Sequence, residues 1–206
     1  MIRGSNVPAL ITEVIDSIAV IRFNRPASRN PLSAAALTEL DRVVVSYVAR
    51  RDLKALVLTG TEDVFASGAN IRELNTLDPA GAAEFSRRGQ QIFPRIAEMT
   101  QVTIAAINGY CMGGALDLAL ACDVRVASRH AVFSHPGGRL GIITGWGGTQ
   151  RLARLIGRSR ALDLFCTTRR VSGTEALDIG LVSRVEDPVL DAALKLAREA
   201  IQQIGQ

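Results

Sequence analysis

Two glycine-bearing turns, each after a strongly apolar run, are the segments of this sequence best suited to chemistry. The first turn, residues 65–70, follows the apolar run 54–60, and the second, residues 108–117, follows the run 102–107. A chain that passes from a strand through glycines into a helix exposes backbone N–H groups, where the helix dipole favours negative charge. Two such turns brought together would form a two-donor pocket for an oxyanion. Neither turn has the spacing GxGxxG or GxxxxGK[ST], so neither predicts a dinucleotide or nucleotide site.

The strands and helices that must hold these turns in place follow from the apolar pattern. Strands are predicted at residues 54–60, 102–107, 123–127 and 131–133, and a hairpin around Asp16-Ser17 is predicted at residues 9–23. Helices are predicted after Ser33, which can act as an N-cap, around Phe85 to Met99, from Gly113 onward, and at residues 188–204. Because strands and helices alternate without a linker or a repeat, we expect an α/β fold with one continuous core.

The composition is that of a folded domain and excludes several classes of protein. The 206 residues suit one substantial domain, with 48% hydrophobic and 21% charged residues. No apolar run approaches the roughly 18 residues that a membrane span needs, and the first residues lack the apolar core of a signal peptide. The three cysteines have no CxxC spacing, so neither a disulfide framework nor a metal site is predicted. We therefore expect a cytoplasmic protein. Cys111 lies inside the second turn and has no paired histidine, so we expect its side chain to pack in the interior rather than to act as a nucleophile.

The net charge of +4 is carried almost entirely by arginine. Of the 24 basic residues, all except Lys54 and Lys195 are arginines. They are scattered along the chain and only 4% of residues are aromatic, a pattern that does not favour nucleic-acid binding. Most of them are expected on the solvated surface, and a few would suit a phosphorylated small molecule, because the guanidinium fork matches phosphate.

The whole sequence resembles the crotonase (enoyl-CoA hydratase/isomerase) family. The segments that carry the resemblance run in order over nearly the full chain. They are Asn24-Arg-Pro26, Phe65-Ala-Ser-Gly-Ala-Asn-Ile71, Ile104-Ala-Ala-Ile-Asn-Gly-Tyr-Cys-Met-Gly-Gly-Ala-Leu-Asp117, Ala121-Cys-Asp123, Gly147-Gly-Thr-Gln-Arg-Leu152 and Gly173-Thr-Glu-Ala-Leu-Asp-Ile-Gly-Leu-Val182. The resemblance implies an α/β spiral of β-β-α units that binds an acyl-CoA thioester, with coenzyme A as part of the substrate and no metal or redox cofactor. It also implies a homotrimer or a pair of trimers.

The resemblance assigns the two glycine turns a specific role. The thioester carbonyl is expected to sit between the backbone N–H groups of Ala69 and Gly114, next to Gly68 and Gly113. Such donors would stabilise the enolate that forms when a proton leaves, or a nucleophile adds, near the thioester. Removing one donor in a comparable acyl-transfer site costs roughly a hundred- to a thousand-fold in rate.

The acid–base groups of this sequence differ from those of the hydratases it resembles. Those enzymes use two glutamates; the first position falls here on Asp117, one carbon shorter, and the second falls on Gly137, which has no proton to give. His135 lies two residues before Gly137, and a neutral imidazole suits proton transfer near pH 7. Asp117 is therefore either a catalytic carboxylate or a helix residue that caps or pairs. His135 is either an assisting proton carrier or a loop histidine that hydrogen-bonds locally.

For the coenzyme phosphates, the resemblance points to Arg25 and Arg29, which flank the loop near the adenine end, and to Arg72 after the first turn. Each of the three is alternatively a surface charge.

The leading hypothesis is an enzyme of the enoyl-CoA hydratase/isomerase type. The alternatives are another reaction on the same scaffold, such as thioester hydrolysis or decarboxylation, in which Gly137 leaves room for water or a departing group, or a silent acyl-CoA-binding subunit.

The resemblance divides the chain into an acyl-CoA-binding core at residues 1–187 and a C-terminal helix at residues 188–206, which is shorter than the helical region of the relatives. The helix carries an apolar stripe made of Leu190, Leu194, Ala197, Ile201 and Ile204. This stripe would pack either on its own domain or on a partner subunit. We expect an acyl end of the pocket that is open, or closed by a neighbouring chain.

Overall fold

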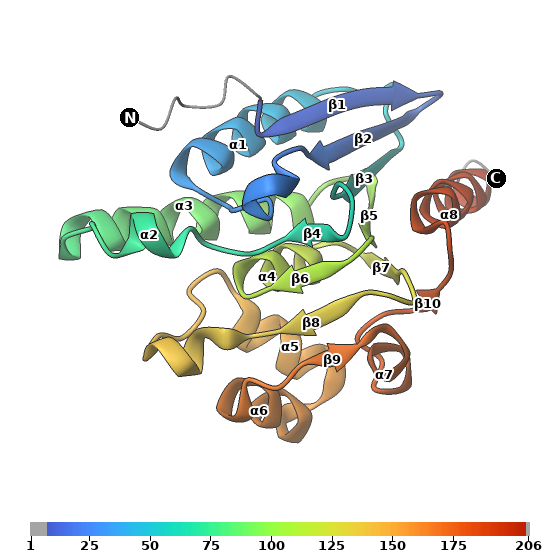
Figure 1. Ribbon diagram of the computed structural model, residues 1–206. Helices are drawn as coiled ribbons and strands as arrows, with labels where there is room; N and C mark the ends of the chain where they lie inside the picture. The colour runs from blue at the N-terminus through green and yellow to red at the C-terminus, as the bar shows by residue number, and fades with distance from the viewer. Residues whose placement is uncertain (1–7, 205–206) are drawn as a thin grey trace.

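The chain folds around two β-sheets, and the computed structural model describes residues 8–204 (Figure 1). The larger sheet has the strand order β1 (Leu10–Ile15), β2 (Ile18–Phe23), β3 (Ala55–Thr59), β5 (Val102–Ile107), β7 (Val124–Ala127) and β10 (Arg184–Val185). Its strands are parallel except for the β1–β2 hairpin. The smaller sheet has the order β4 (Val64–Ala66), β6 (Tyr110–Met112), β8 (Val132–Ser134) and β9 (Val171–Ser172). The predicted hairpin is confirmed, and Asp16 turns the chain with φ of 56°.

Successive passes of the chain add one strand to each sheet before a helical segment, so the strands form a spiral. β3 and β4 precede α2 (Ile71–Leu74) and α3 (Pro79–Ala97), and β5 and β6 precede α4 (Gly114–Ala121). β7 and β8 precede a 3-10 turn (Pro136–Leu140), α5 (Gly148–Ile156) and α6 (Arg158–Thr167). The other helical segments are α1 (Ala34–Val48), a 3-10 turn at Pro26–Ser28, α7 (Gly173–Asp178) and α8 (Val189–Ile204). The predicted spiral of β-β-α units is thereby confirmed.

The larger sheet is buried on both faces, because alternate side chains along its strands enter two different apolar clusters. On β2, Ala19 and Ile21 face the main core beneath α1 and α3, whereas Ile18 and Val20 face a second cluster that α8 completes. Continuous apolar runs of this kind are typical of parallel strands covered on both sides.

Helix α8 packs on its own domain, which decides between the two possibilities left open by the sequence. It lies against β3, β5 and β7, on the side of the sheet away from α1 (Figure 1). The predicted stripe is right only in part. Leu194 and Ala197 are buried, Leu190 and Ile201 are partly buried, and the side chain of Ile204 lies outside the described residues. The buried face also contains Val189, Ala192 and Ala193, since small side chains let the helix approach the sheet closely.

The predicted cap at Ser33 is confirmed at the start of α1. The hydroxyl oxygen of Ser33 accepts a hydrogen bond from the backbone N–H of Ala36 at 3.2 Å, which satisfies one of the unpaired donors at the start of α1. The carboxylate of Glu73 reaches the same helix end and accepts the N–H of Ala34 at 3.1 Å. This contact ties α2, which directly follows the first glycine turn, to the start of α1.

Candidate active site

The two glycine turns lie side by side because β4, β6 and β8 are neighbouring parallel strands. Ala66 pairs with Cys111, and Met112 pairs with Ser134, so these strands end at the same edge of the smaller sheet. The chain leaves this edge through residues 67–69, 113–114 and 135–137. The carboxyl edge of parallel strands is where α/β proteins commonly bind ligands. The structure therefore brings Ala69, Gly114 and His135, far apart in the sequence, to one place.

The contact between the two turns depends on glycine. Gly68 has φ of +81°, and a Cβ atom there would lie 2.5 Å from the carbonyl oxygen of Met112 and 3.0 Å from the nitrogen of Gly114. Gly113 has φ of +54° and sets the chain into α4, so Gly114 is the first residue of that helix and its N–H has no intrahelical acceptor. Ala69 and Gly114 both line the adjacent cavity. Two neighbouring backbone donors at a cavity wall suit an oxygen that gains negative charge.

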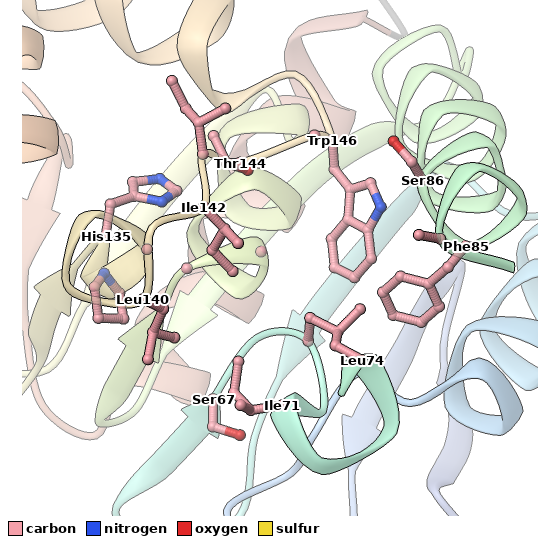
Figure 2. Close-up of a pocket in the computed structure, with 18 residues that line it drawn as sticks. Ser67, Ile71, Leu74, Phe85, Ser86, His135, Leu140, Ile142, Thr144 and Trp146 are labelled. Atoms are coloured by element: carbon pink, nitrogen blue, oxygen red, sulfur yellow. The ribbon is translucent and has the colours of Figure 1, made fainter. Parts of the chain in front are cut away.

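The cavity beside the turns has a volume of about 250 Å³ and a predominantly apolar wall. Figure 2 shows His135, Leu140 and Thr144 on one side of it, and Trp146, Phe85 and Ser86 on the other, with Ile71 and Leu74 between them. The aliphatic and aromatic side chains come from α2, from α3 and from the segment between β8 and α5, and of the two helices only α3 was predicted from the sequence. An apolar chain is the group that this wall would accommodate.

Trp146 is a wall residue that the sequence reasoning missed, although it is the only tryptophan in the chain. Its ring packs against Phe85 and Phe93, with centroid distances of 5.2 and 5.4 Å. The indole fits there because Gly89 and Gly114 have no side chain; a Cβ atom on either would approach the ring to 2.3 Å. One signal was available in the sequence, namely a unique tryptophan within the glycine-rich segment before α5.

Asp117 and His135 are brought together in the interior. Oδ1 of Asp117 lies 3.2 Å from Nε2 of His135, and the two side chains are 0% and 4% exposed. The hydroxyl of Thr144 donates a hydrogen bond to Oδ2 of Asp117. The ring of His135 packs against Phe165 with 4.8 Å between centroids. Asp117 is enclosed by protein, whereas His135 lines the cavity.

Gly137 lies where the structure leaves no room for a side chain. A Cβ atom there would be 2.6 Å from the carbonyl oxygen of Ile142. The turn that contains Gly137 separates the first cavity from a second one of about 780 Å³, which is bounded by α5 and α6. His135 and Gly137 line both cavities. Gly137 therefore serves the tight packing of this turn.

A third cavity, of about 250 Å³, lies on the other side of the first glycine turn and shares Ser67 and Pro136 with the first cavity. Three arginines line it, Arg29, Arg139 and Arg170. The Arg29 guanidinium lies 5.5 Å from the ring centroid of Tyr110, and Arg139 Nε donates to Thr168 Oγ1 at 2.7 Å. No acidic side chain lines this cavity, and none of the three arginines forms an ion pair within the described part of the chain. The cavity is suited to an anion.

The other two arginines proposed from the sequence lie elsewhere. Arg72 is exposed near the start of α2, and neither it nor Arg25 lines any of the three cavities around the turns. The backbone N–H of Arg25 donates to Oδ1 of Asn30 at 2.6 Å, which shapes the loop that carries Arg29. Arg170 was not anticipated from the sequence, because it lies far from both turns along the chain and reaches them only through the pairing of β8 with β9.

The buried thiols agree with the packing interpretation. Cys111 is fully buried, and this burial raises the pKa of its thiol well above the ordinary value. Burial likewise raises the pKa of Cys122 to about 12, whereas Cys166 is exposed. Among residues 8–204 no His, Cys, Asp and Glu side chains gather into a group of three that could hold a metal ion. No helix in that range is long and apolar enough to cross a membrane.

Comparisons with known proteins give a consistent result. A family model described as enoyl-CoA hydratase/isomerase matches residues 13–206. The short-chain-enoyl-CoA hydratase of Clostridium acetobutylicum is 36% identical over 195 residues, which cover 93% of this chain and 75% of that protein. The crotonyl-CoA hydratase of Syntrophomonas wolfei is 38% identical over 180 residues, covering 87% of this chain and 69% of that protein.

Solved structures show the same similarity in three dimensions. DspI of Pseudomonas aeruginosa superposes with a TM-score of 0.91 at 34% sequence identity, over 98% of this chain and 83% of that one. The enoyl-CoA hydratase of Bacillus anthracis superposes with a TM-score of 0.89 at 32% identity, over 93% of this chain and 76% of that one.

Proposed function

The chain belongs to the enoyl-CoA hydratase/isomerase family, and from that premise we propose that it adds water to, or shifts the double bond of, an unsaturated acyl-CoA. The thioester carbonyl oxygen lies between the N–H groups of Ala69 and Gly114, and the acyl chain occupies the apolar cavity lined by Phe85 and Trp146. One observation carries this proposal, the contact of the two glycine turns at the wall of that cavity.

The two N–H groups stabilise the negative charge that develops on the carbonyl oxygen. When a proton leaves the acyl chain, or water adds to it, electrons move onto the thioester oxygen to form an enolate. Fixed backbone donors at the wall of an apolar cavity interact with this charge without having to reorganise. The apolar wall strengthens this effect because it lowers the local dielectric constant.

The arginine-lined cavity supports a substrate that carries phosphate groups. We propose that a phosphate of the coenzyme contacts Arg29, Arg139 and Arg170, since guanidinium groups without a carboxylate partner bind phosphate well. This assignment retains Arg29 and adds Arg139 and Arg170, while Arg25 and Arg72 stay as proposals for the outer part of the coenzyme.

A panel of acyl-CoA thioesters tests the reaction, with products identified by mass spectrometry. Hydration adds the mass of water, isomerisation keeps the mass but changes the retention time, and hydrolysis or decarboxylation releases a fragment. Hydration of crotonyl-CoA also removes its conjugated double bond, so the loss of the corresponding absorbance measures hydration directly. Hydrolysis or decarboxylation alone, or tight binding of every thioester without turnover, would contradict the proposal and favour the corresponding alternative.

Replacing Ala69 tests the oxyanion site. Ala69→Pro removes the backbone N–H and is expected to lower kcat/KM roughly a hundred- to a thousand-fold. Ala69→Gly keeps the N–H and serves as the matched control, and circular dichroism verifies that both variants fold. Equal activity of the two variants would show that the Ala69 N–H does not act on the reaction.

We also propose that the protein self-associates, as a trimer or a pair of trimers. Leu140, Ile142 and Ile143 expose apolar side chains at the mouth of the cavity, where a neighbouring chain would cover them. Light scattering on the eluted protein measures the mass, and a monomer at micromolar concentration would contradict this proposal.

A further inference from the structure

The contact between Asp117 and His135 brings together two polar atoms that the fold has removed from water. Oδ1 of Asp117 and Nε2 of His135 are the buried side-chain atoms of the described chain that have no hydrogen-bond partner. They lie 3.2 Å apart, which is within ion-pair distance, although they are not aligned as a hydrogen bond. Unpaired polar atoms are costly inside a protein, so a pair that faces each other calls for a functional reason.

The surroundings of Asp117 prevent it from reaching a substrate. Thr144 donates to its other carboxylate oxygen, and α5 presses so closely that a Cβ atom on Gly148 would lie 1.9 Å from Oδ1. Asp117 is 0% exposed and lines none of the cavities around the turns. A general base must come within about 2.6–3.2 Å of its proton, directly or through one water. An enclosed carboxylate does not meet this condition.

His135 is placed differently. Its ring lines the cavity that Ala69 and Gly114 also line, and Figure 2 shows the imidazole at the edge of that cavity. Nε2 faces Asp117, so Nδ1 is the ring nitrogen left for a bound molecule. Phe165 packs against the ring from α6 and restricts its rotation.

We propose that His135 is the catalytic residue that exchanges a proton with the acyl chain through Nδ1, and that Asp117 is the positioning residue behind it. The inference rests on the proposed function and reverses the roles expected from the sequence, where Asp117 acts and His135 assists. Asp117 holds the proton on Nε2, which leaves the Nδ1 lone pair free to act as a base, and its negative charge stabilises the imidazolium that forms.

The proton transfers balance with this single acid–base group. In hydration, Nδ1 takes a proton from water as the water oxygen bonds to the β-carbon, and the π electrons move to the thioester oxygen. The imidazolium then gives the same proton to the α-carbon as the carbonyl re-forms, so the net change is the addition of water. In isomerisation, Nδ1 removes a proton at one end of the allylic system and returns it at the other.

Several other titratable groups surround this pair. Cys111 on β6 lies close enough to Asp117 for its thiol to be affected by the carboxylate charge, and it is fully buried. Arg158 and Cys166 of α6 line the second cavity together with His135, and Arg139 belongs to the turn that follows His135. None of these groups is within hydrogen-bond contact of the His135 ring in the described structure, so Asp117 is the charge that acts on it most directly.

The chain contains only two histidines, which permits a direct test. His130 is exposed in the turn between β7 and β8, so His130→Gln is the matched control and also leaves one imidazole signal in the NMR spectrum. We expect His135→Gln to lower kcat about a hundred- to ten-thousand-fold with KM changed only a few-fold, and His130→Gln to keep full activity. In the His130→Gln background, the ¹⁵N signals of the remaining ring are expected to show the proton on Nε2, and adding Asp117→Asn is expected to shift this proton towards Nδ1 and to lower kcat with little change in KM.

The outcomes separate this inference from the proposed function. If His135→Gln folds, binds acyl-CoA and retains full turnover, or if Asp117→Asn leaves the position of the ring proton and kcat unchanged, the inference is wrong. His135→Asn serves as a second variant should His135→Gln fail to fold. If the unmodified protein turns over no acyl-CoA, the proposed function fails, while the ¹⁵N signals of the His135 ring still decide whether Asp117 fixes the position of the ring proton. If Ala69→Pro abolishes turnover and His135→Gln does not, only the inference about His135 is overturned.

Discussion

The backbone nitrogen of Gly114 lies 3.0 Å from the point that a Cβ atom on Gly68 would occupy. Two turns separated by more than forty residues thus touch at a distance that excludes any side chain. The contact exists because β4 and β6 pair in parallel and end together, so the residues after each strand emerge side by side. The proposed oxyanion site depends on this closeness.

Gly68→Ala tests the contact between the turns. The variant places a left-handed alanine at φ of +81° and forces its Cβ against Met112 and Gly114. Gly180→Ala is the control, because Gly180 has φ of +77° with no atom within 4 Å of an added Cβ. The shared backbone strain costs about 1–2 kcal/mol in each. We expect Gly68→Ala to lose more free energy of unfolding in urea, and to lose most turnover; equal losses in the two variants would contradict the close contact.

Trp146 provides a spectroscopic report on the acyl cavity. It is the only tryptophan, it is 5% exposed, and it lines the cavity wall. An acyl chain that enters beside the indole changes its surroundings, so intrinsic fluorescence is expected to change with acyl-CoA concentration and to saturate. Coenzyme A without an acyl chain should leave the emission nearly unchanged. The same change with coenzyme A alone would place the acyl group elsewhere.

The arginine-lined cavity is tested by removing one charge at a time. Arg29→Gln, Arg139→Gln and Arg170→Gln are each expected to raise KM several-fold with little effect on kcat, because a guanidinium–phosphate contact binds ground state and transition state alike. Arg160→Gln, exposed on α6, is the control. Added salt should reduce the differences between the variants and the unmodified protein. A thioester of dephospho-coenzyme A that shows the same KM changes would exclude the 3′-phosphate as the bound group.

The thiols are predicted to differ in reactivity and to make stability depend on pH. One thiol per folded chain, Cys166, is expected to react with a thiol reagent, and all three after unfolding.

The Cys122 thiol has a pKa of about 12 in the folded chain, raised from 9.0 by burial. Its contribution to stability is complete below pH 9 and is lost as the pH rises towards 12, because only the unfolded chain releases the proton there. Cys122→Ala should therefore flatten the fall of unfolding free energy between pH 9 and 12, and an unchanged slope would contradict this.

The longer strands of the large sheet, the longest helices and the two glycine turns were predictable from the sequence, because they depend on local patterns, whereas the short strands β4, β6, β9 and β10 were not predicted. Apolar runs marked β3 and β5, Ser33 marked the start of α1, and glycines after the two strands marked the turns. Arg170 and Trp146 were missed, since their approach to the site comes from the pairing of β8 with β9 and from the packing of α3 against the segment before α5.

The sequence by itself determined the family, the α/β spiral and the presence of a carboxylate and an imidazole near the expected acid–base positions. Only the tertiary structure decided which of them meets the cavity. Asp117 is on the inner face of α4, and the packing of Thr144 and Gly148 encloses it, whereas His135 follows the end of β8 at the cavity edge. Burial depends on elements distant in the chain, so no local pattern around Asp117 or His135 could reveal it.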